Sequence, residues 1–390
     1  MQFKFSEGGE LRKHWMLEEG MHFLNHGSFG AAPSVVLQAQ QRYRERMERQ
    51  PVDFLVRQMP QELRAAADAL ASFLGARGQD LAFVENATAG ANAVLRSYPW
   101  RAGDELLLST HAYPAVQNLV RFVAAQFGLV VREFDFAFPL VEGEILQRFG
   151  EALTPRTRMA IIDHVSSPLA IVYPLQEMLA LCRAQGVQTL VDGAHVPGML
   201  PLAIESLGAD WYIGNCHKWL FAPKGCGFLW AAPGSRDFLQ PPVISLRMEE
   251  GFPASFDWVG TRDVSAWLAI SAALDFYRTM GGAAIPAHLH GKVLEAAKVL
   301  CAAWQVELPA APGDYGAMVT LPLPLTGDAT LERANQLRDQ LWQASRIEVP
   351  LFAFKQGLWI RISAQLYNTT EDYQALASAV QRLPGFGDRY

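Results

Sequence analysis

From about residue 80, short apolar runs alternate along the chain with longer stretches whose apolar positions repeat with helical spacing. The apolar runs are DLAFVEN, DELLLS, LVVREFDF, TRMAIIDHV and VQTLVDG, and the stretches between them include PAVQNLVRFVAAQFG and PLQEMLALCRAQG. Strands that are apolar on both faces are typical of parallel sheets covered by helices. This alternation therefore predicts an α/β domain built from strand–helix–strand units.

The pattern changes at both ends of this region. Two further apolar runs, ADWYIGN and CGFLWAA, follow each other closely. They leave little room for a helix, so we expect some antiparallel pairing near the end of a mostly parallel sheet. Upstream, residues 34–50 and 60–74 have the pattern of two surface helices, ended by Pro51 and Gly75. Downstream, a helix near Ser265 links to an α+β part, with strands in AMVTLPL, IEVPLFAF and LWIRIS and helices in TLERANQLRDQLWQ and EDYQALASAVQRL.

Composition narrows the class of protein. The chain has 390 residues, half of them hydrophobic and 18% charged, which supports a packed core and excludes a disordered chain. Its net charge of -6, without a long run of one sign, argues against a nucleic-acid-binding protein. Four scattered cysteines fit a reducing cytoplasm, and neither a signal peptide nor a membrane-spanning run is expected.

Polar residues follow two of the apolar runs at the points where the strands end. VQTLVDG ends in Asp192 and Gly193, and ADWYIGN leads to His217 and Lys218. The carboxyl ends of strands form the ligand crevice in open α/β sheets, so we expect Asp192 and Lys218 to face one site. A buried lysine has a lowered pKa and can form a Schiff base with an aldehyde, while a carboxylate keeps a pyridine nitrogen protonated. The pair predicts pyridoxal 5′-phosphate as the cofactor.

Several segments together resemble a known family. DGAH and NCHKWLFAPKGCG, with NATAG upstream and IRISAQLYNT downstream, are similar to the class V aminotransferases, which are fold-type I pyridoxal phosphate enzymes. The resemblance runs from about Phe23 to Tyr367 and is greatest to the isopenicillin N epimerase-like branch, which includes carbon–sulfur lyases. It implies a mostly parallel seven-stranded sheet between helices and a smaller C-terminal α+β domain. It also implies three parts: an N-terminal segment (1–22) associated with the small domain, a large cofactor-binding domain (23–255), and a linker helix with the small domain (256–390).

The resemblance implies roles around the cofactor. Lys218 would carry the internal aldimine, Asp192 would pair with the pyridine nitrogen, and His195 would lie near the phenolic oxygen unless it is an ordinary turn histidine. The other residues implied to hold the cofactor contribute the phosphate site, a stacking ring and a second contact to the phenolic oxygen, and they are Thr88, Ala89, Asn215, His217, Tyr113 and Ser167. A helix cap, a core tyrosine and a turn serine would give the same letters.

The resemblance also implies contacts to the substrate and to a second subunit. Thr261 would reach the phosphate of the neighbouring subunit, which implies a homodimer with shared active sites. Arg361 would bind the α-carboxylate of an amino acid, since its guanidinium suits bidentate capture. Asn25 and His26 would line the substrate side, although NHGS suits a polar turn equally well.

The type of reaction stays open at this stage. Epimerisation at Cα, β-elimination of a sulfur group at Cβ, and transamination all fit the residues, and a non-catalytic binding protein is the remaining alternative. A cysteine desulfurase is disfavoured, because its nucleophilic cysteine would have to be Cys301, which lies on an apolar helix face. No HExxH, GxGxxG, GxxxxGK[ST] or GxSxG motif is present, so we expect no metal and no nucleotide or hydrolase chemistry.

Overall fold

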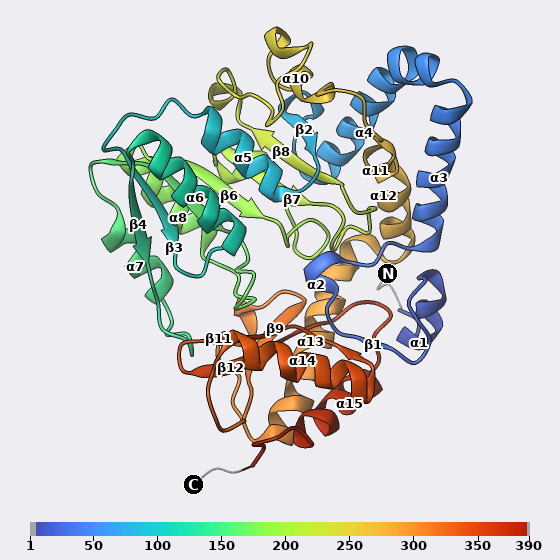
Figure 1. Cartoon of the computed structure of the whole chain (residues 1–390), viewed down its shortest axis with the longest axis vertical. Coiled ribbons are helices and arrows are strands. Elements are labelled where there is room, and N and C mark those ends of the chain that lie inside the picture. Colours follow the sequence, from blue (N-terminus) through green and yellow to red (C-terminus); the bar gives the residue numbers. More distant parts are fainter. Residues whose placement is uncertain (1–4, 388–390) are drawn as a thin grey trace.

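The structure, a computed structural model, describes residues 5–387. Its centre is a seven-stranded sheet in the order β2-β8-β7-β6-β5-β3-β4 (Figure 1). The strands are β2 (Leu81–Val84), β3 (Glu105–Ser109), β4 (Val130–Phe134), β5 (Thr157–Asp163), β6 (Gln188–Gly193), β7 (Trp211–Asn215) and β8 (Gly227–Ala231). In this sheet the pairs β2–β8 and β7–β8 are antiparallel and the other four pairs are parallel, which confirms the mixed, mostly parallel sheet.

Helices cover both faces of the sheet, as the apolar strands require. One face packs on α5 (Ala87–Ser97) and α6 (Pro114–Phe127). The other is covered mainly by α4 (Met59–Phe73), α7 (Glu144–Ala152), α8 (Leu175–Gln185) and α12 (Ile270–Thr279). Helix α8 ends at Gly186, which has φ +67° and caps the helix in the left-handed conformation. The remaining short helices of this part are α9 (Ile204–Leu207), α10 (Ala254–Asp257) and α11 (Ser265–Leu268).

The two helices expected before the sheet both form, and each has one exposed face. Helix α3 (Ser34–Arg49) ends close to the expected position, and a π-helical turn (Asp53–Gln58) leads directly into α4. Leu63 and Leu70 of α4 are fully buried. Gln61, Ala65, Asp68 and Ser72 of the same helix are exposed. Helix α4 is therefore a surface helix, as expected, whose apolar face packs against the core of the large domain.

The C-terminal part is a smaller α+β unit. A three-stranded antiparallel sheet has the order β11 (Leu351–Phe354), β12 (Gly357–Ser363), β9 (Met318–Pro322) and packs with α13 (Ile285–Trp304), α14 (Leu331–Ser345) and α15 (Thr370–Gln381). The run IEVPLFAF, expected as one strand, is divided at Pro350 into β10 (Ile347–Glu348) and β11, which belong to different sheets. Proline has no backbone N–H, so a continuous ladder cannot pass through it.

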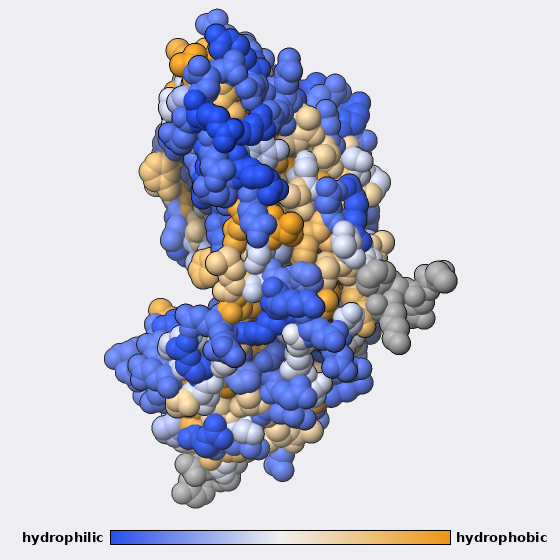
Figure 2. All heavy atoms as spheres, turned by 90° about the vertical axis from the view of Figure 1, so that its right-hand side faces the viewer, coloured by the Kyte–Doolittle hydropathy of each residue, from blue (hydrophilic) through white to orange (hydrophobic). Residues whose placement is uncertain are grey.

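The N-terminal segment joins the two parts. Helix α1 (Gly8–Leu11) precedes β1 (His22–Phe23), which pairs in parallel with β10 of the small unit. Helix α2 (His26–Phe29) then lies between this unit and the large one (Figure 1). Seen from the side, the outline of the molecule is notched where the two parts meet (Figure 2). No helix within residues 5–387 is long and apolar enough to cross a membrane.

Candidate active site

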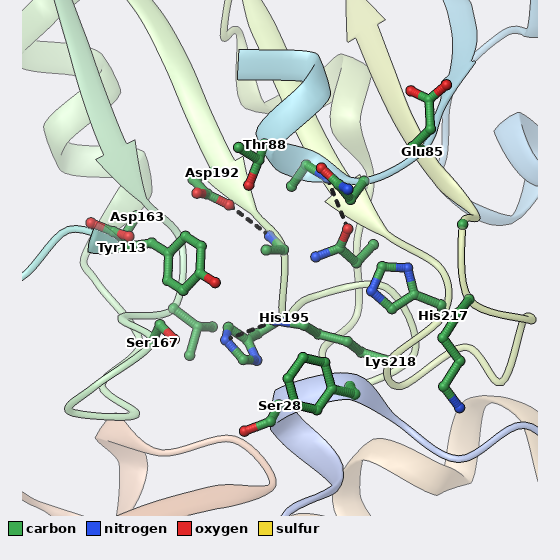
Figure 3. A pocket seen from close by; sticks show the side chains of 18 residues that line it. Ser28, Glu85, Thr88, Tyr113, Asp163, Ser167, Asp192, His195, His217 and Lys218 are labelled. Carbon is green, nitrogen blue, oxygen red and sulfur yellow. Dashed lines mark hydrogen bonds between the residues drawn. The ribbon is translucent and has the colours of Figure 1, made fainter. Parts of the chain in front are cut away.

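A cavity of about 320 Å³ lies at the carboxyl ends of the central strands. Its wall combines the ends of β5, β6 and β7, the N-terminal ends of α5 and α6, and Ser28 and Phe29 of α2 (Figure 3). Eight of the residues predicted for the site line this cavity: Thr88, Tyr113, Ser167, Asp192, His195, Asn215, His217 and Lys218. They gather here because parallel strands deliver the residues that follow them to one edge of the sheet.

Lys218 is the basic centre of the cavity. Its side chain is buried, and its Nζ lies 3.3 Å from Nε2 of His195. Burial and the nearby charge of Arg361 lower the pKa of Lys218 to about 7, against the opposing attraction of Asp192. Near neutral pH a large share of this amine is therefore unprotonated and nucleophilic. Burial also lowers the pKa of His195 well below its usual range, so its ring is neutral and can accept a hydrogen bond.

The acidic side of the cavity contains two carboxyl groups. Asp192 on β6 is buried, and its Oδ1 accepts a hydrogen bond from the backbone N–H of Ala194 at 3.0 Å. Asp163, the last residue of β5, also lines the cavity (Figure 3). Asp163 was not among the predicted site residues, although TRMAIID ends in an acid in the same way as TLVD. That shared pattern is the signal that could have identified it.

The N-terminal end of α5 faces the cavity with its backbone N–H groups. Two side-chain oxygens already accept from it: Oδ1 of Asn86 accepts from Ala89 at 2.9 Å, and Oδ1 of Asn215 accepts from Ala87 at 2.8 Å. Thr88 lies between them on the cavity wall. Ala89 does not line the cavity, and its N–H is used by the helix cap. The amide nitrogen of Asn215 and the hydroxyl of Thr88 are left as side-chain donors for an anion.

Arg361 on β12 lies behind the cavity wall and is hydrogen-bonded to two residues of that wall. Its guanidinium donates to the carbonyl oxygen of Ser167 and, at 3.1 Å, to the hydroxyl of Ser28, both of which line the cavity. The arginine itself is buried, and its Nε has no hydrogen-bond partner among the described residues. Tyr113, at the start of α6, is 44% exposed and lies at the mouth of the cavity.

His26, predicted to line the substrate side, is held by two buried hydrogen bonds. Its Nε2 donates to the carbonyl oxygen of Lys218 at 3.0 Å, and its Nδ1 lies 2.8 Å from the hydroxyl of Tyr367. Both ring nitrogens are thereby used, the ring is fully buried, and burial lowers its pKa to about 3. His26 therefore lies outside the cavity wall and links the backbone of Lys218 to Tyr367 in the C-terminal part.

Two other predicted residues also lie outside the cavity wall of the single chain. Asn25 is buried. Its amide nitrogen donates a hydrogen bond to Glu348 at 3.1 Å, and its Oδ1 accepts one from the hydroxyl of Ser28. Thr261 is exposed in the loop before α11, so its contact with a second subunit stays a prediction. Within residues 5–387, no group of three or more histidine, cysteine or acidic side chains is arranged to hold a metal ion.

Known proteins match this chain over nearly its whole length. The model of the Aminotransferase class-V family matches residues 23–376. The chain is 34% identical over 395 residues to isopenicillin N epimerase from Streptomyces clavuligerus, covering 96% of this chain and 98% of that protein. It is 32% identical over 407 residues to the putative L-cysteine desulfhydrase 1 from Oryza sativa subsp. japonica, covering 95% and 84%.

A solved structure has the same fold. A mutant of C-DES with glycine covalently linked to its PLP cofactor superposes with a TM-score of 0.82 at 22% identity, over 95% of this chain and 99% of that one. This agreement, with the observed sheet order, confirms the fold expected from the sequence.

Proposed function

Because the chain belongs to the class V aminotransferase family, we propose that it is a carbon–sulfur lyase that cleaves the Cβ–S bond of cysteine or a cysteine conjugate. The single observation that carries the proposal is the buried Lys218, whose pKa of about 7 makes it a base at the end of β7. Relatives that are named L-cysteine desulfhydrases support the choice of a sulfur leaving group.

The cofactor of this family, pyridoxal 5′-phosphate, fits the cavity. Lys218 supplies an amine for its aldehyde, Asp192 a carboxylate for its pyridine nitrogen, and the N-terminal end of α5 donors for its phosphate. Tyr113 at the cavity mouth offers a flat ring for stacking. When bound, the cofactor withdraws electrons from the substrate Cα through its ring.

Residues of the chain bind the substrate and move its proton. We assign the substrate carboxylate to Arg361, which lies directly behind the cavity wall, where its bonds to Ser28 and Ser167 fix the direction of the guanidinium. Lys218 Nζ takes the Cα proton, and its contact with His195 orients the amine. The Cβ–S bond then breaks and the sulfur leaves with the bonding electron pair. Cysteine and water thus yield pyruvate, ammonia and sulfide.

Epimerisation is the second candidate, because two relatives named isopenicillin N epimerase are 34% and 35% identical to this chain. It would need a second acid on the face of Cα opposite Lys218. Transfer of sulfur to a cysteine of the enzyme is not part of the proposal. Cys301 lies half-buried on α13, away from the cavity wall, and burial raises the pKa of its thiol.

The test has two stages. Borohydride reduction of the protein with its cofactor, followed by peptide mapping, should place a pyridoxyl group on Lys218. Lys224→Ala, which removes another lysine of the cavity wall, should keep this adduct, and Lys218→Ala should lose it.

Incubation of the wild type with L-cysteine should then release sulfide and pyruvate in equal amounts. Release of the D-amino acid without sulfide would replace the lyase by an epimerase, and formation of a keto acid that keeps its sulfur would indicate an aminotransferase. Protein that takes up no cofactor would be a binding protein.

We also propose that the enzyme is a homodimer with shared active sites. Thr261 is exposed, and Phe29, 70% exposed, stands at the cavity mouth where a second subunit would cover it. Lys218→Ala alone should be inactive, and Thr261→Ala alone should be weakly active. Mixing them should restore activity, because half of the sites in a mixed dimer are intact. A monomer in light scattering would contradict this proposal.

A further inference from the structure

A second buried acid lies beside Asp192 on the neighbouring strand. Asp163 on β5 and Asp192 on β6 are register partners in the parallel ladder. Adjacent strands lie about 4.8 Å apart, and register partners point to the same face of a sheet. Both side chains line the cavity, and only 4% of Asp163 and 6% of Asp192 is exposed to solvent (Figure 3).

The two carboxyl groups have different surroundings. Burial raises the pKa of Asp192, but a backbone hydrogen bond from Ala194 and the attraction of Lys218 favour its charged form. Asp163 takes part in no ion pair formed by the described residues, and its Oδ2 has no hydrogen-bond partner among them. The titratable groups that interact electrostatically with Asp163 are Asp192 and Tyr173, and both are acids. A hydrogen bond to its own backbone favours the charged form of Asp163, but a buried carboxylate without a cation is strongly unfavourable.

We propose that Asp163 and Asp192 hold a single negative charge between them, with Asp163 as the proton-carrying member that leaves the charge on Asp192. The role toward the pyridine nitrogen rests on the proposed function, whereas the shared charge is a property of the chain alone. Two carboxylates this close cannot both ionise at low cost. Burial and the charge of Asp192 accordingly raise the pKa of Asp163 well above its usual range.

Asp163 is thus a positioning residue. One negative charge matches one positive charge on a protonated pyridine nitrogen, so the cavity would bind that form of the cofactor with its charge balanced. A second carboxylate would leave one unpaired anion buried in the site, which is costly. Keeping Asp163 neutral avoids this cost and leaves Asp192 free to pair.

Infrared spectra of the protein without cofactor test the shared charge directly. At about pH 8, the carbonyl band of a protonated carboxylic acid should be present in the wild type and absent in Asp163→Asn. Asp257→Asn is the matched control, because it removes a buried carboxyl that is paired with Arg64 and has a pKa of about 6. This control should keep the band.

The pH dependence separates an electrostatic role from a structural one. In Asp192→Asn, the pH at which the band disappears should fall by about two pH units, the effect of removing one charge about 5 Å away at an effective dielectric constant of about 20. A wild type without the band at about pH 8, or an unchanged midpoint in Asp192→Asn, would overturn the shared charge.

Cofactor affinity tests the link to the proposed function. Asp163→Asn replaces one neutral group by another, so affinity should stay within about threefold of wild type. Asp192→Asn removes the anion and should weaken binding at least about tenfold. Equal losses in the two variants would overturn the assignment of the charge to Asp192. If the wild type binds no cofactor, the proposed function fails, and the infrared result still decides the shared charge.

Discussion

Replacing Lys218 by methionine should stabilise the protein in its cofactor-free form. The lysine is buried and forms no ion pair among the described residues, and Arg361 adds a like charge nearby. A buried, unpaired ammonium group costs folding free energy, whereas methionine fills a similar volume without charge. Lys218, which the proposed reaction requires, therefore lowers the free energy of unfolding of the cofactor-free protein.

The magnitude follows from the pKa of Lys218, which falls from an ordinary 10.5 to about 7 on folding. Each pKa unit is worth about 1.4 kcal/mol, so at about pH 7 the lysine costs about 4 kcal/mol. The variant also loses the contact with His195, which destabilises it by about 1 kcal/mol. The net increase in the free energy of unfolding of Lys218→Met is therefore about 3 kcal/mol. Between pH 7 and 10.5 the folded state loses the proton and the unfolded state keeps it. The stability of the wild type thus rises with pH, and the advantage of the variant should shrink to about 1 kcal/mol near pH 9.

Urea unfolding of the cofactor-free proteins at about pH 7 and pH 9 measures both effects. Lys292→Met is the matched control, because burial also lowers the pKa of Lys292, to about 8. Its ammonium group, however, donates to the carbonyl oxygens of Gln365, Leu366 and Asn368. Removing it leaves these acceptors unpaired, so the control should be destabilised. A Lys218→Met protein that is less stable than the wild type, or whose advantage does not fall with pH, would refute the reasoning.

Three other substitutions, one of them with a matched control, probe the site. Arg361→Ala should weaken amino-acid binding at least about tenfold and cofactor binding less than about threefold in spectral titrations, and equal effects would remove the arginine from substrate recognition. Gly30→Ala should cost about 2–5 kcal/mol in urea unfolding, since Gly30 has φ +67° and its added Cβ would lie 2.2 Å from the carbonyl oxygen of His217. Gly143→Ala, with φ +77° and nothing within 4 Å, should cost about 1–2 kcal/mol, and equal losses would show that the contact is unimportant. Asn215→Ala should leave the N–H of Ala87 unpaired and weaken cofactor binding. A cofactor affinity equal to that of the wild type in equilibrium dialysis would contradict this role of Asn215.

The sequence alone was enough to predict the sheet and the position of its main chemical groups. Strands that are apolar on both faces are recognisable locally, and the polar residue that ends each one must emerge at the edge where ligands bind. Asp192 and Lys218 were found in this way, and both line the cavity. The division of IEVPLFAF at Pro350 was missed, because the pairing of its two halves in different sheets is decided by tertiary packing.

What only the tertiary structure decided is which groups meet. His26 has the sequence of a polar loop, yet the fold places it between Lys218 and Tyr367, where both ring nitrogens are bonded. Asp163 ends a strand like any other, and only the register of β5 against β6 sets it beside Asp192. Such pairings join residues far apart in the chain, and their energies depend on burial and on neighbouring charge. Neither quantity exists until the strands are aligned, so the chain determines the chemical groups and the fold determines their protonation.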